Sequence, residues 1–336
     1  MRSLPEDLSM ERVRQVLSDA WRIRAESVEY VPEGGGSYHW KLTDQDGQPR
    51  FVTVDDLDDK DWIGQVRDAV FEGLGRALST AAALRQDAGL AFVVAPLATG
   101  DGDLLRRLDD RYAVSVFPFL VGRSHPFGPY ADERLRDEAL EMIAALHRAT
   151  PVVLDRAPGH VPSFTGRCGL DAFLADPDLP WDGGPFSAAA RDLLAPRAAD
   201  LGKLTAGFDR LVDQTGQARA SRVITHGEPH PGNLMSVDGR LRLIDWDTTG
   251  LAPPERDLSL IVTAGGDGID RYQEATGRQV EPSVITLYQV RWYLDDISSA
   301  IQLFRNRHRR TTDTHRWWQG LAPGLEQLPT WLDRVS

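Results

Sequence analysis

The chain has 336 residues, 41% of them hydrophobic, and carries a formal net charge of −12 at pH 7. This length and apolar content exclude a disordered protein and suffice for a sizeable core in two lobes. The acidic balance argues against non-specific nucleic-acid binding, which needs a basic surface to displace counterions. It favours a cationic small-molecule partner, although acidity also simply keeps a protein soluble.

The cellular compartment is predicted from the cysteine content and the N-terminal sequence. Cys168 has no second cysteine with which to form an internal disulfide. The N-terminal residues include acidic side chains where a secretory signal needs an apolar run, and no stretch approaches the roughly 20 apolar residues that cross a bilayer. We therefore expect a cytoplasmic protein without a membrane partner.

The N-terminal part of the sequence predicts a small lobe of strands and helices. Apolar residues recur at helical spacing over residues 10–21, behind the candidate N-cap Ser9. Residues 28–56 are typical of a three-stranded antiparallel meander, because a glycine-rich turn and an Asp-Gly turn separate β-rich runs. A long helix over residues 64–89 and two strands, AFVVAPL and RYAVSVFPFL, complete an α+β lobe near residue 120.

The rest of the chain is predicted to be mainly helical. A helix over residues 133–149 is ended by Pro151, and residues 150–185 are expected to form a long loop or insertion. Two short strands, RVIT and LRLIDW, interrupt the helical part. Further helical structure is expected from Val284 to Arg307 and on through His315 to Gly320.

The stretch ITHGEPHPGNLM, residues 224–235, places a carboxylate, two imidazoles and an amide on one loop. His226 and His230 have the spacing of zinc ligands on a helix, but the glycines and prolines around them forbid that helix. Polar residues in such a loop also occur without any function. Neither interpretation accounts for LRLIDWDTTG, which ends a strand on Asp245 and Asp247. A carboxylate-and-amide loop facing these aspartates is what a site for Mg²⁺ and a nucleotide requires.

These two segments resemble a known family. HGEPHPGN resembles the catalytic loop of the aminoglycoside phosphotransferase and choline kinase family, and IDWDTTGLAPPERDL resembles its metal-binding segment, with wording closest to spectinomycin phosphotransferases. The resemblance implies a bilobal, protein-kinase-like α+β fold. An N-lobe over residues 1–117 would contain the N-terminal helix, a Gly-rich hairpin and a five-stranded sheet plus helix. Residues 118–122 would form a hinge, and residues 123–336 a mainly helical C-lobe.

The resemblance also implies catalytic and metal-binding roles. Glu228 would take the place of the catalytic Asp, which orients the acceptor hydroxyl. Asn233 and Asp245 would hold Mg²⁺ against the phosphates, and Asp247 would assist at a second metal.

Structural and nucleotide-binding roles follow from the same resemblance. His226 would brace the loop, and Asp257 would hold its backbone. ATP or GTP would bind along the Gly-rich turn, the third strand and the hinge, at Gly34, Gly35, Gly36, Ser37, Thr53, Phe117, Phe119 and Leu120.

Glu228 departs from the family pattern, which has Asp at this position. A misplacement on the order of 1 Å costs about a hundredfold in rate. Phosphoryl transfer depends mainly on positioning and charge neutralisation, so a longer base on an adjusted loop still works. Pro229 and Pro231 stiffen the loop and favour this second interpretation.

Thr53 is the other departure, because the strand should present a phosphate-pairing Lys there. Its absence leaves Glu72 on the following helix without a cation. Lys41 and Arg76 are candidate replacements. A two-residue hairpin loop at Asp46-Gly47 would point Lys41 away from the face of Thr53, whereas a three-residue loop would bring it round.

The acceptor is expected to bind on the C-lobe helices. Asp295 and Asp296 are candidates to meet ammonium groups, and the neighbouring Trp292 is a candidate to stack on a ring or cation. The alternative is that one Asp faces solvent and the aromatic side chains belong to the core.

Together these features predict an O-phosphotransferase that uses ATP or GTP with Mg²⁺. It would act on a hydroxyl of a small molecule, such as an aminoglycoside-like or other antibiotic, and would confer resistance. Two alternatives remain: a catalytically weak or inactive kinase-like protein that binds nucleotides, and a metabolic kinase for choline, a sugar or an amino alcohol.

Overall fold

A computed structural model describes residues 1–5, 7–216, 222–262 and 266–336. The chain forms two compact units. Unit 1 comprises Met1–His160 and Ser221–Val280, and unit 2 comprises Val161–Ala220 and Glu281–Ser336. A sheet with helices in unit 1 and a helical unit 2 confirm the predicted α+β class. The predicted hinge at 118–122 lies inside unit 1, and the division into lobes stays a prediction.

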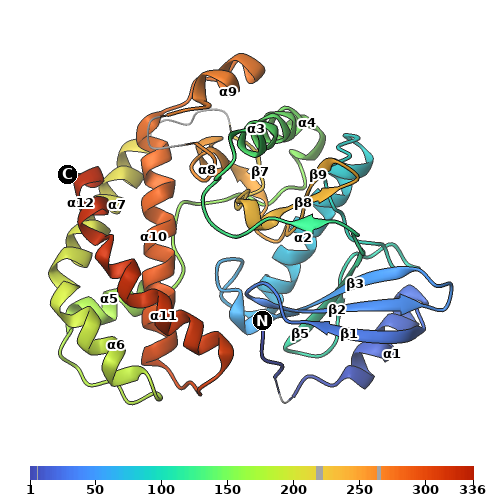
Figure 1. Ribbon diagram of the computed structural model, residues 1–336, viewed down its shortest axis with the longest axis horizontal. Helices are drawn as coiled ribbons and strands as arrows, with labels where there is room; N and C mark the ends of the chain where they lie inside the picture. Colours follow the sequence, from blue (N-terminus) through green and yellow to red (C-terminus); the bar gives the residue numbers. More distant parts are fainter. Residues whose placement is uncertain (6, 217–221, 263–265) are drawn as a thin grey trace. The chain divides into compact units, whose positions relative to one another are not determined.

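A five-stranded antiparallel sheet in unit 1 contains the predicted meander (Figure 1). In spatial order its strands are β1 Ala25–Val31, β2 Ser37–Asp44, β3 Pro49–Asp56, β5 Tyr112–Pro118 and β4 Arg106–Arg107. The predicted strand AFVVAPL is wrong. Val93 makes an isolated bridge to Leu243, and Pro96 has no N–H to donate to a ladder. The fifth strand is β4 instead.

Alternation along β3 gives the sheet two different faces. Val52 and Val54 belong to a hydrophobic cluster with Val13 and Leu17 of α1, Met10–Trp21. The side chains of Phe51, Thr53 and Asp55 therefore point to the opposite face, as do Lys41, His39 and Ser37, which pair with them on β2. One face is apolar and covered by a helix, and the other carries the polar candidates.

The predicted helices of unit 1 are confirmed, with short additional elements. Ser9 caps α1 by accepting a hydrogen bond from Arg12 N–H at 3.5 Å. The helices that follow are α2 Arg67–Gln86, α3 Glu133–Arg148, α4 Thr150–Val153, α8 Glu255–Leu258 and α9 Ile269–Thr276. The 3₁₀ turn η1 Leu57–Asp59 lies directly before Lys60. A second 3₁₀ turn, η3 Pro231–Asn233, lies near the end of the 224–235 loop.

Two small sheets hold the candidate catalytic segments. β7 Val223–Thr225 pairs with β10 Gly250–Ala252. β8 Leu234–Val237 lies between β6 Arg123–Ser124 and β9 Arg240–Leu243. The predicted strands at RVIT and LRLIDW are thereby confirmed as β7 and β9, and β8 joins them.

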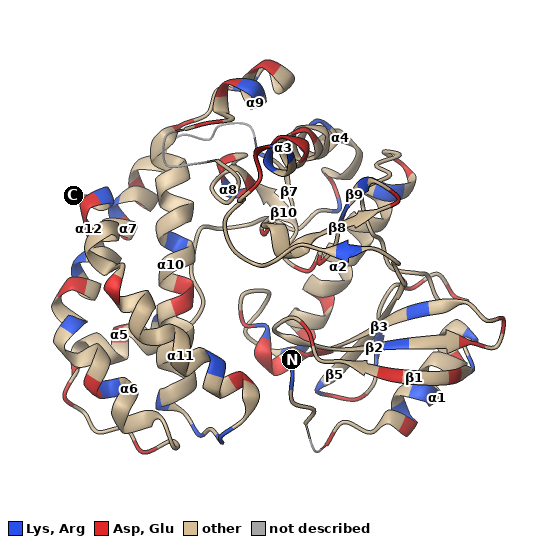
Figure 2. Cartoon of the chain, in the orientation of Figure 1, with Lys and Arg blue, Asp and Glu red and all other residues tan. Residues whose placement is uncertain are grey.

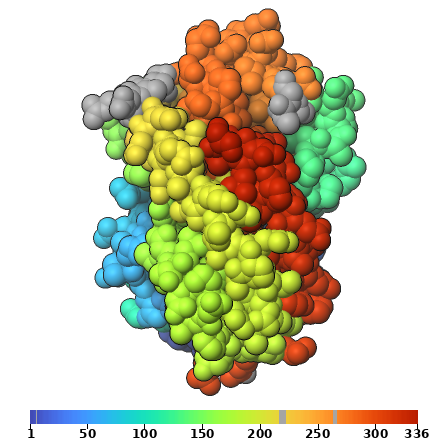
Figure 3. Space-filling model, turned by 90° about the vertical axis from the view of Figure 1, so that its left-hand side faces the viewer, coloured from blue at the N-terminus to red at the C-terminus, as the bar shows by residue number. Residues whose placement is uncertain are grey.

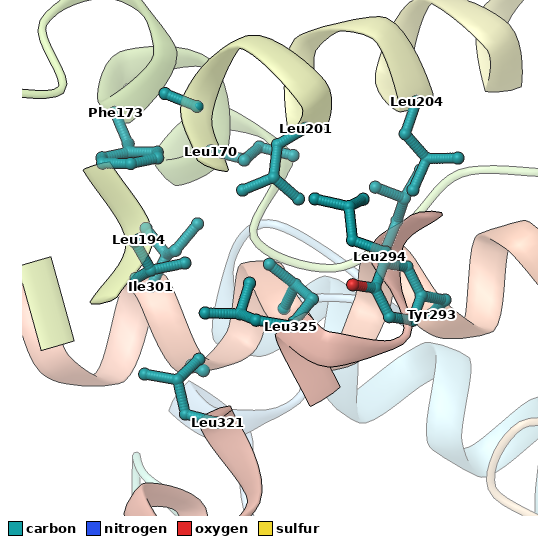
Figure 4. Close-up of a cluster of buried hydrophobic side chains, with 14 of the residues drawn as sticks. Leu170, Phe173, Leu194, Leu201, Leu204, Tyr293, Leu294, Ile301, Leu321 and Leu325 are labelled. Atoms are coloured by element: carbon teal, nitrogen blue, oxygen red, sulfur yellow. The ribbon is translucent and has the colours of Figure 1, made fainter. Parts of the chain in front are cut away.

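Unit 2 is a helical bundle around its own core (Figure 4). Its helices are α5 Arg167–Ala175, α6 Ser187–Leu194, α7 Ala198–Gly216, α10 Pro282–Arg305, α11 Thr312–Glu326 and α12 Leu328–Val335, with the 3₁₀ turn η2 Ala195–Arg197 after α6. α7 and α12 lie side by side (Figure 3). The predicted long loop over 150–185 is wrong in part, because α4 and α5 lie within it; Leu170 and Phe173 of α5 are buried in the core.

Within the ranges that the structure describes, no helix combines the length and the apolar character needed to cross a membrane.

Candidate active site

The loop between β7 and β8 carries Glu228 and Asn233 in a fixed backbone conformation. Gly227 has φ +101°, and a Cβ there would lie 2.4 Å from Nη2 of the buried Arg256. Arg256 in turn donates hydrogen bonds to Thr225 Oγ1 at 2.9 Å and to Thr248 O at 2.8 Å. Glycine is therefore required for both backbone angle and space immediately before the candidate base.

Asp257 accepts hydrogen bonds from the backbone of this loop, the contact that the family resemblance implies. Its buried carboxylate accepts hydrogen bonds from His226 N–H at 2.9 Å and Gly227 N–H at 2.7 Å. His147 Nε2 lies 3.1 Å from the same carboxylate. Burial alone would raise the pKa of Asp257, but the hydrogen bond to His147 and the neighbouring positive groups lower it.

His226 braces the loop as a neutral imidazole. Its Nδ1 accepts a hydrogen bond from Glu228 N–H at 3.2 Å, so Nε2 carries the proton and donates to Ile244 O at 2.9 Å. Burial lowers the pKa of His226 to about 4. Tyr130 adds a further brace by donating its hydroxyl to Pro229 O at 2.6 Å.

The backbone segments that carry Asn233 and Asp245 lie side by side, although they belong to different loops. The backbone N–H of Ile244 donates to Asn233 O at 3.0 Å, directly beyond the Leu234–Leu243 pair of β8 and β9. The side-chain Nδ2 of Asn233 donates a hydrogen bond to Glu228 O at 2.9 Å. This hydrogen bond fixes the orientation of the amide group. The amide oxygen is the atom suited to a cation.

The two aspartates after β9 differ in environment. Asp245 has φ +66°, which turns the backbone sharply after the strand. Part of its surface is accessible, yet desolvation by the surrounding protein and then the carboxylates of Asp247 and Glu228 raise its pKa. Burial also opposes the charge of Asp247, but Lys60 outweighs this and lowers its pKa. An acidic cluster of this kind attracts a cation.

Lys60 is the residue that the sequence interpretation missed. Its Nζ lies 2.6 Å from Asp247 Oδ2 and 3.1 Å from Asp55 Oδ1, and the side chain is 1% exposed. Burial alone would lower the pKa of Lys60, but the two carboxylates raise it. The lysine follows η1, whose N-cap is Asp56, so a short turn and not a strand brings it to the site.

The predicted replacements for the missing strand lysine lie elsewhere. A three-residue loop at 45–47 joins β2 and β3, and Lys41 pairs with Phe51 and shares the face of Thr53. However, its Nζ lies 4.7 Å from the ring centroid of Phe119. Glu72 and Arg76 are exposed on α2, so the expected uncompensated charge of Glu72 remains in water.

The Gly-rich turn connects β1 to β2 as predicted. Gly34 and Gly36 have φ +75° and +80°, and a side chain at Gly35 would meet open space. Ser37, at the start of β2, donates its hydroxyl to Asp55 Oδ1 at 2.6 Å. Thr53 lies next to this pair on β3, with Oγ1 3.3 Å from His39 Nδ1. The turn and the Lys60 ion pair therefore share Asp55.

The predicted adenine-binding residues lie at the end of β5. Phe117 pairs with Phe51 at the edge of the polar sheet face, and Phe119 and Leu120 follow directly after the strand. All three are partly exposed. Their role in binding the adenine stays a prediction.

On α10 of unit 2 the predicted acceptor-binding residues separate into two kinds. Asp295 accepts from Thr165 N–H at 2.5 Å and pairs with Arg291 at 3.0 Å, so its contacts are structural. Asp296 is exposed, yet desolvation by packed neighbours and the charge of Asp295 raise its pKa to about 6. Trp292 is half-buried on the same helix, and Tyr293 belongs to the core. Figure 2 shows one acidic segment on α10, and its sequence has Asp295 and Asp296 there.

The donor set fits a hard divalent cation. The amide oxygen of Asn233 and the carboxylates of Asp245 and Asp247 are the oxygen ligands that Mg²⁺ prefers. Among the described residues, no group of three or more His, Cys, Asp and Glu side chains has the arrangement of a complete metal site. Mg²⁺ commonly takes one or two carboxylates and completes its coordination with phosphates and water.

Comparisons with known proteins agree with this geometry. The model of the phosphotransferase enzyme family matches residues 40–293. A spectinomycin phosphotransferase crystallised with ADP and spectinomycin has a TM-score of 0.70 at 16% identity, with 96% of this chain and 99% of that chain covered.

Two further solved structures share the fold. An amicoumacin kinase has a TM-score of 0.59 at 14% identity over 96% of this chain and 94% of its own. A choline kinase from Streptococcus pneumoniae has a TM-score of 0.52 at 13% identity over 94% and 98%. A search of curated protein sequences gives no significant match. Because the family model covers most of the chain, including both candidate loops, this protein belongs to the phosphotransferase enzyme family.

Proposed function

We propose that this phosphotransferase transfers the γ-phosphoryl group of ATP or GTP to a hydroxyl of a small, cationic acceptor. The proposal is supported by two hydrogen bonds of Asn233: its side chain donates to Glu228 O, and its carbonyl accepts from the N–H of Ile244, the residue before Asp245. A carboxylate base beside metal-ligand oxygens is the arrangement that phosphoryl transfer needs.

Glu228 orients the acceptor hydroxyl and accepts its proton as the phosphoryl group is transferred. Its backbone is fixed by His226 and Gly227, both of which are bound to Asp257. Such positioning contributes a large part of the rate, because the transition state is loose and the protein forms no covalent bond to the phosphoryl group. The Glu therefore acts from a braced loop and not from a flexible one.

Asn233 and Asp245 would hold Mg²⁺, with Asp247 assisting, and the bound ion would neutralise charge on the phosphate oxygens. The Gly-rich turn at Gly34–Ser37 would cover the phosphates. The backbone after β5, from Phe117 to Leu120, would meet the adenine edge at the hinge predicted for 118–122.

For the acceptor we propose that Asp296, and not Asp295, meets a cationic group. Two solved structures with a similar fold are named as a spectinomycin phosphotransferase and an amicoumacin kinase. Antibiotics with an ammonium group near a hydroxyl are thus the first acceptors to test, followed by choline and ethanolamine, since solved neighbours are named as kinases for both. Trp292, on the same helix, would contact a ring of the acceptor.

The proposal is tested by incubating the protein with MgATP or MgGTP and a panel of aminoglycosides, spectinomycin, amicoumacin, choline and amino alcohols. Mass spectrometry should find one acceptor that gains a phosphoryl group. Asp245→Ala should abolish this product and the Mg²⁺-dependent part of nucleotide binding. Full activity in this variant would refute the metal assignment, and nucleotide binding without any product would favour the inactive-kinase alternative.

A further inference from the structure

Lys60 carries a buried positive charge that the proposed chemistry has not yet used. Its ammonium lies between Asp247, which follows β9, and Asp55, near the end of β3. A lysine that is 1% exposed requires partners of opposite charge, because burial of an unpaired ammonium is costly. The fold thus maintains a cation at the point where the sheet meets the candidate metal segment.

The ammonium of Lys60 lies on the polar face of the five-stranded sheet, next to the Gly-rich turn. Thr53 and Asp55 point to the same face of β3, and Asp55 pairs in register with Ser37, where the Gly-rich turn ends. Lys60 reaches this face from η1, outside the strand. Its charge therefore lies beside the turn expected to cover the phosphates.

Lys41 is the competing cation on this face, but it lies in a different place. It pairs with Phe51, two positions before Thr53, and its Nζ is 4.7 Å from the ring centroid of Phe119. That contact directs the ammonium toward the residues expected to meet the adenine. Lys60 is instead in contact with Asp55 and Asp247.

The ring of Trp62 and the Gly-rich turn cover Lys60. The Trp62 ring centroid is 5.2 Å from Nζ, and Trp62 is 40% exposed, so its ring lies at the surface over the ammonium. A Cβ at Gly36 would be 3.7 Å from Trp62 Cη2, so the glycine turn packs against the same ring. Gly34 and Gly36 of the turn have positive φ. The amino group of Met1 donates to Gly34 O at 3.3 Å and to Ser37 O at 2.7 Å, so a displacement of the turn has to break these hydrogen bonds.

We infer that Lys60 replaces the missing strand lysine as the cation that pairs with the nucleotide phosphates, with Asp55 as the carboxylate that orients it. An ammonium has three donors, and the two carboxylates take up two of them. Displacement of Trp62 and the glycine turn opens the remaining direction to a phosphate oxygen. This inference rests on the proposed function, because it presumes a nucleoside triphosphate.

The sequence allows a matched test, because Lys41, Lys60 and Lys203 are its three lysines. Each is changed to Met, and affinities for ATP and adenosine are measured by calorimetry in EDTA, so that no metal bridges the phosphates. Lys60→Met should weaken ATP binding by about tenfold to a hundredfold while adenosine binding stays unchanged. Lys203→Met is the control, because Lys203 lies on α7 of unit 2 and pairs there with Asp200.

An unchanged ratio of ATP to adenosine affinity in Lys60→Met would overturn the inference, as would a selective loss of ATP affinity in Lys41→Met. Because removal of Lys60 leaves two carboxylates without their partner, this variant is also the one most prone to misfold. The wild-type protein labelled with ¹³C at lysine Cε provides a second measurement. The Lys60 signal should shift with ATP and not with adenosine; an equal response to both contradicts the inference.

The two proposals fail in different ways. If the wild-type protein binds neither ATP nor adenosine, the proposed function is refuted and the role of Lys60 with it. If the wild type binds ATP and phosphorylates an acceptor but Lys60→Met retains its ATP affinity, only the inference is refuted.

Discussion

Glu228 is the residue at which the chain departs most directly from its family's pattern. Because its loop is fixed by hydrogen bonds, we predict that the loop geometry is adjusted to the longer side chain. The side chain is one methylene longer than Asp, and its backbone is fixed through His226 and Asp257. Glu228→Asp should therefore withdraw the carboxylate and reduce kcat by about a hundredfold. ATP affinity should stay unchanged, and steady-state kinetics with a titration of ATP separates the two quantities.

Glu228→Gln is the control for this prediction, because it keeps the length of the side chain and removes its basicity. It should reduce kcat by about 10²–10⁴-fold, the usual contribution of a general base. Greater activity in Glu228→Asp than in the wild type would show instead that the longer side chain is a defect and that the loop has not adjusted.

The raised pKa of Asp296 leads us to predict that the free energy of unfolding depends on pH. Its pKa is raised from 3.8 to about 6 in the folded protein, so the folded state disfavours its ionised form. Stability contributed by the protonated form is present below the ordinary pKa and is lost as the pH rises through about 6. Asp296→Asn removes this loss. Its Tm should match the wild type at pH 4 and exceed it at pH 8 by about 1–2 °C, because solvent screening limits the effect.

Thermal melts of both proteins at the two pH values check this, with Asp295→Asn as the comparison. Asp295 has structural hydrogen bonds to Thr165 and an ion pair with Arg291, so its removal should lower Tm at pH 8. A lower Tm of Asp296→Asn at pH 8 would contradict the assignment of Asp296 as a strained, partly desolvated carboxylate.

Residue patterns predicted the two loops, but not the buried cation that pairs with Asp55 and Asp247. Glu228, Asn233 and Asp245 are predicted as site residues because their motifs are continuous in sequence. Lys60 was overlooked because it follows a 3₁₀ turn in an acidic stretch, DLDDK, that is typical of a solvated surface. Its burial depends on Asp247, which is distant in sequence, and no local pattern reports such a partner.

At the scale of elements, the β7–β8 loop predicts a sharp requirement for glycine. Gly227→Ala would place a methyl group 2.4 Å from Arg256 Nη2 in addition to a strained φ of +101°. The strain alone costs about 1–3 kcal/mol, and displacement of Arg256 adds to it. We expect a lower Tm and a strong loss of kcat, measured by thermal melts and product formation.

Gly47→Ala is the matched control. Gly47 has φ +71° in the β2–β3 loop, but nothing lies within 4 Å of the position of its Cβ. Gly47→Ala should lower Tm only by the cost of the strained backbone, because the added methyl group meets no neighbour. Its kcat should stay unchanged. If both variants lose the same stability and retain activity, then the contact with Arg256 is not what fixes the catalytic loop.

Elements with clear periodicity were predicted well, and elements defined by partners were not. α1, α2, α3 and α10 follow from helical spacing and caps, because an amphipathic helix is a local pattern. AFVVAPL has the composition of a strand, but Pro96 and a single bridge at Val93 leave it outside the sheet. α5 lies in a segment rich in Gly and Pro, where composition favoured a loop although Leu170 and Phe173 supply a buried face.

At the scale of the molecule, the sequence predicted the family, the α+β class and two lobes, but not the segments from which the two compact units are assembled. Each unit is assembled from two separate segments, and the chain passes between the units more than once. Hydrophobic periodicity shows that a helix has a buried face and carries no information on which distant helix covers it. The core of unit 2 combines α5, α6 and α7 with α10, α11 and α12 (Figure 4), and periodicity alone could not predict this combination.

Separate cores predict that stability and nucleotide binding can be changed independently. Leu294 of α10 is fully buried in the unit 2 core, so Leu294→Ala should cost about 2–5 kcal/mol through lost contacts and a cavity. The proposed nucleotide ligands all belong to unit 1, whose apolar clusters are built from other residues. ATP affinity at 20 °C should thus remain at the wild-type value while Tm falls.

Leu303→Ala provides the comparison, because Leu303 lies on the same helix and only partly enters the same core. It should lower Tm less than Leu294→Ala and also leave ATP affinity unchanged. Acceptor affinity should respond to both in proportion to their effect on α10, since the proposed cation-binding Asp296 lies on that helix. A parallel loss of ATP affinity and stability in Leu294→Ala would show that the nucleotide site depends on the unit 2 core, and the separation of roles between the units would then be wrong.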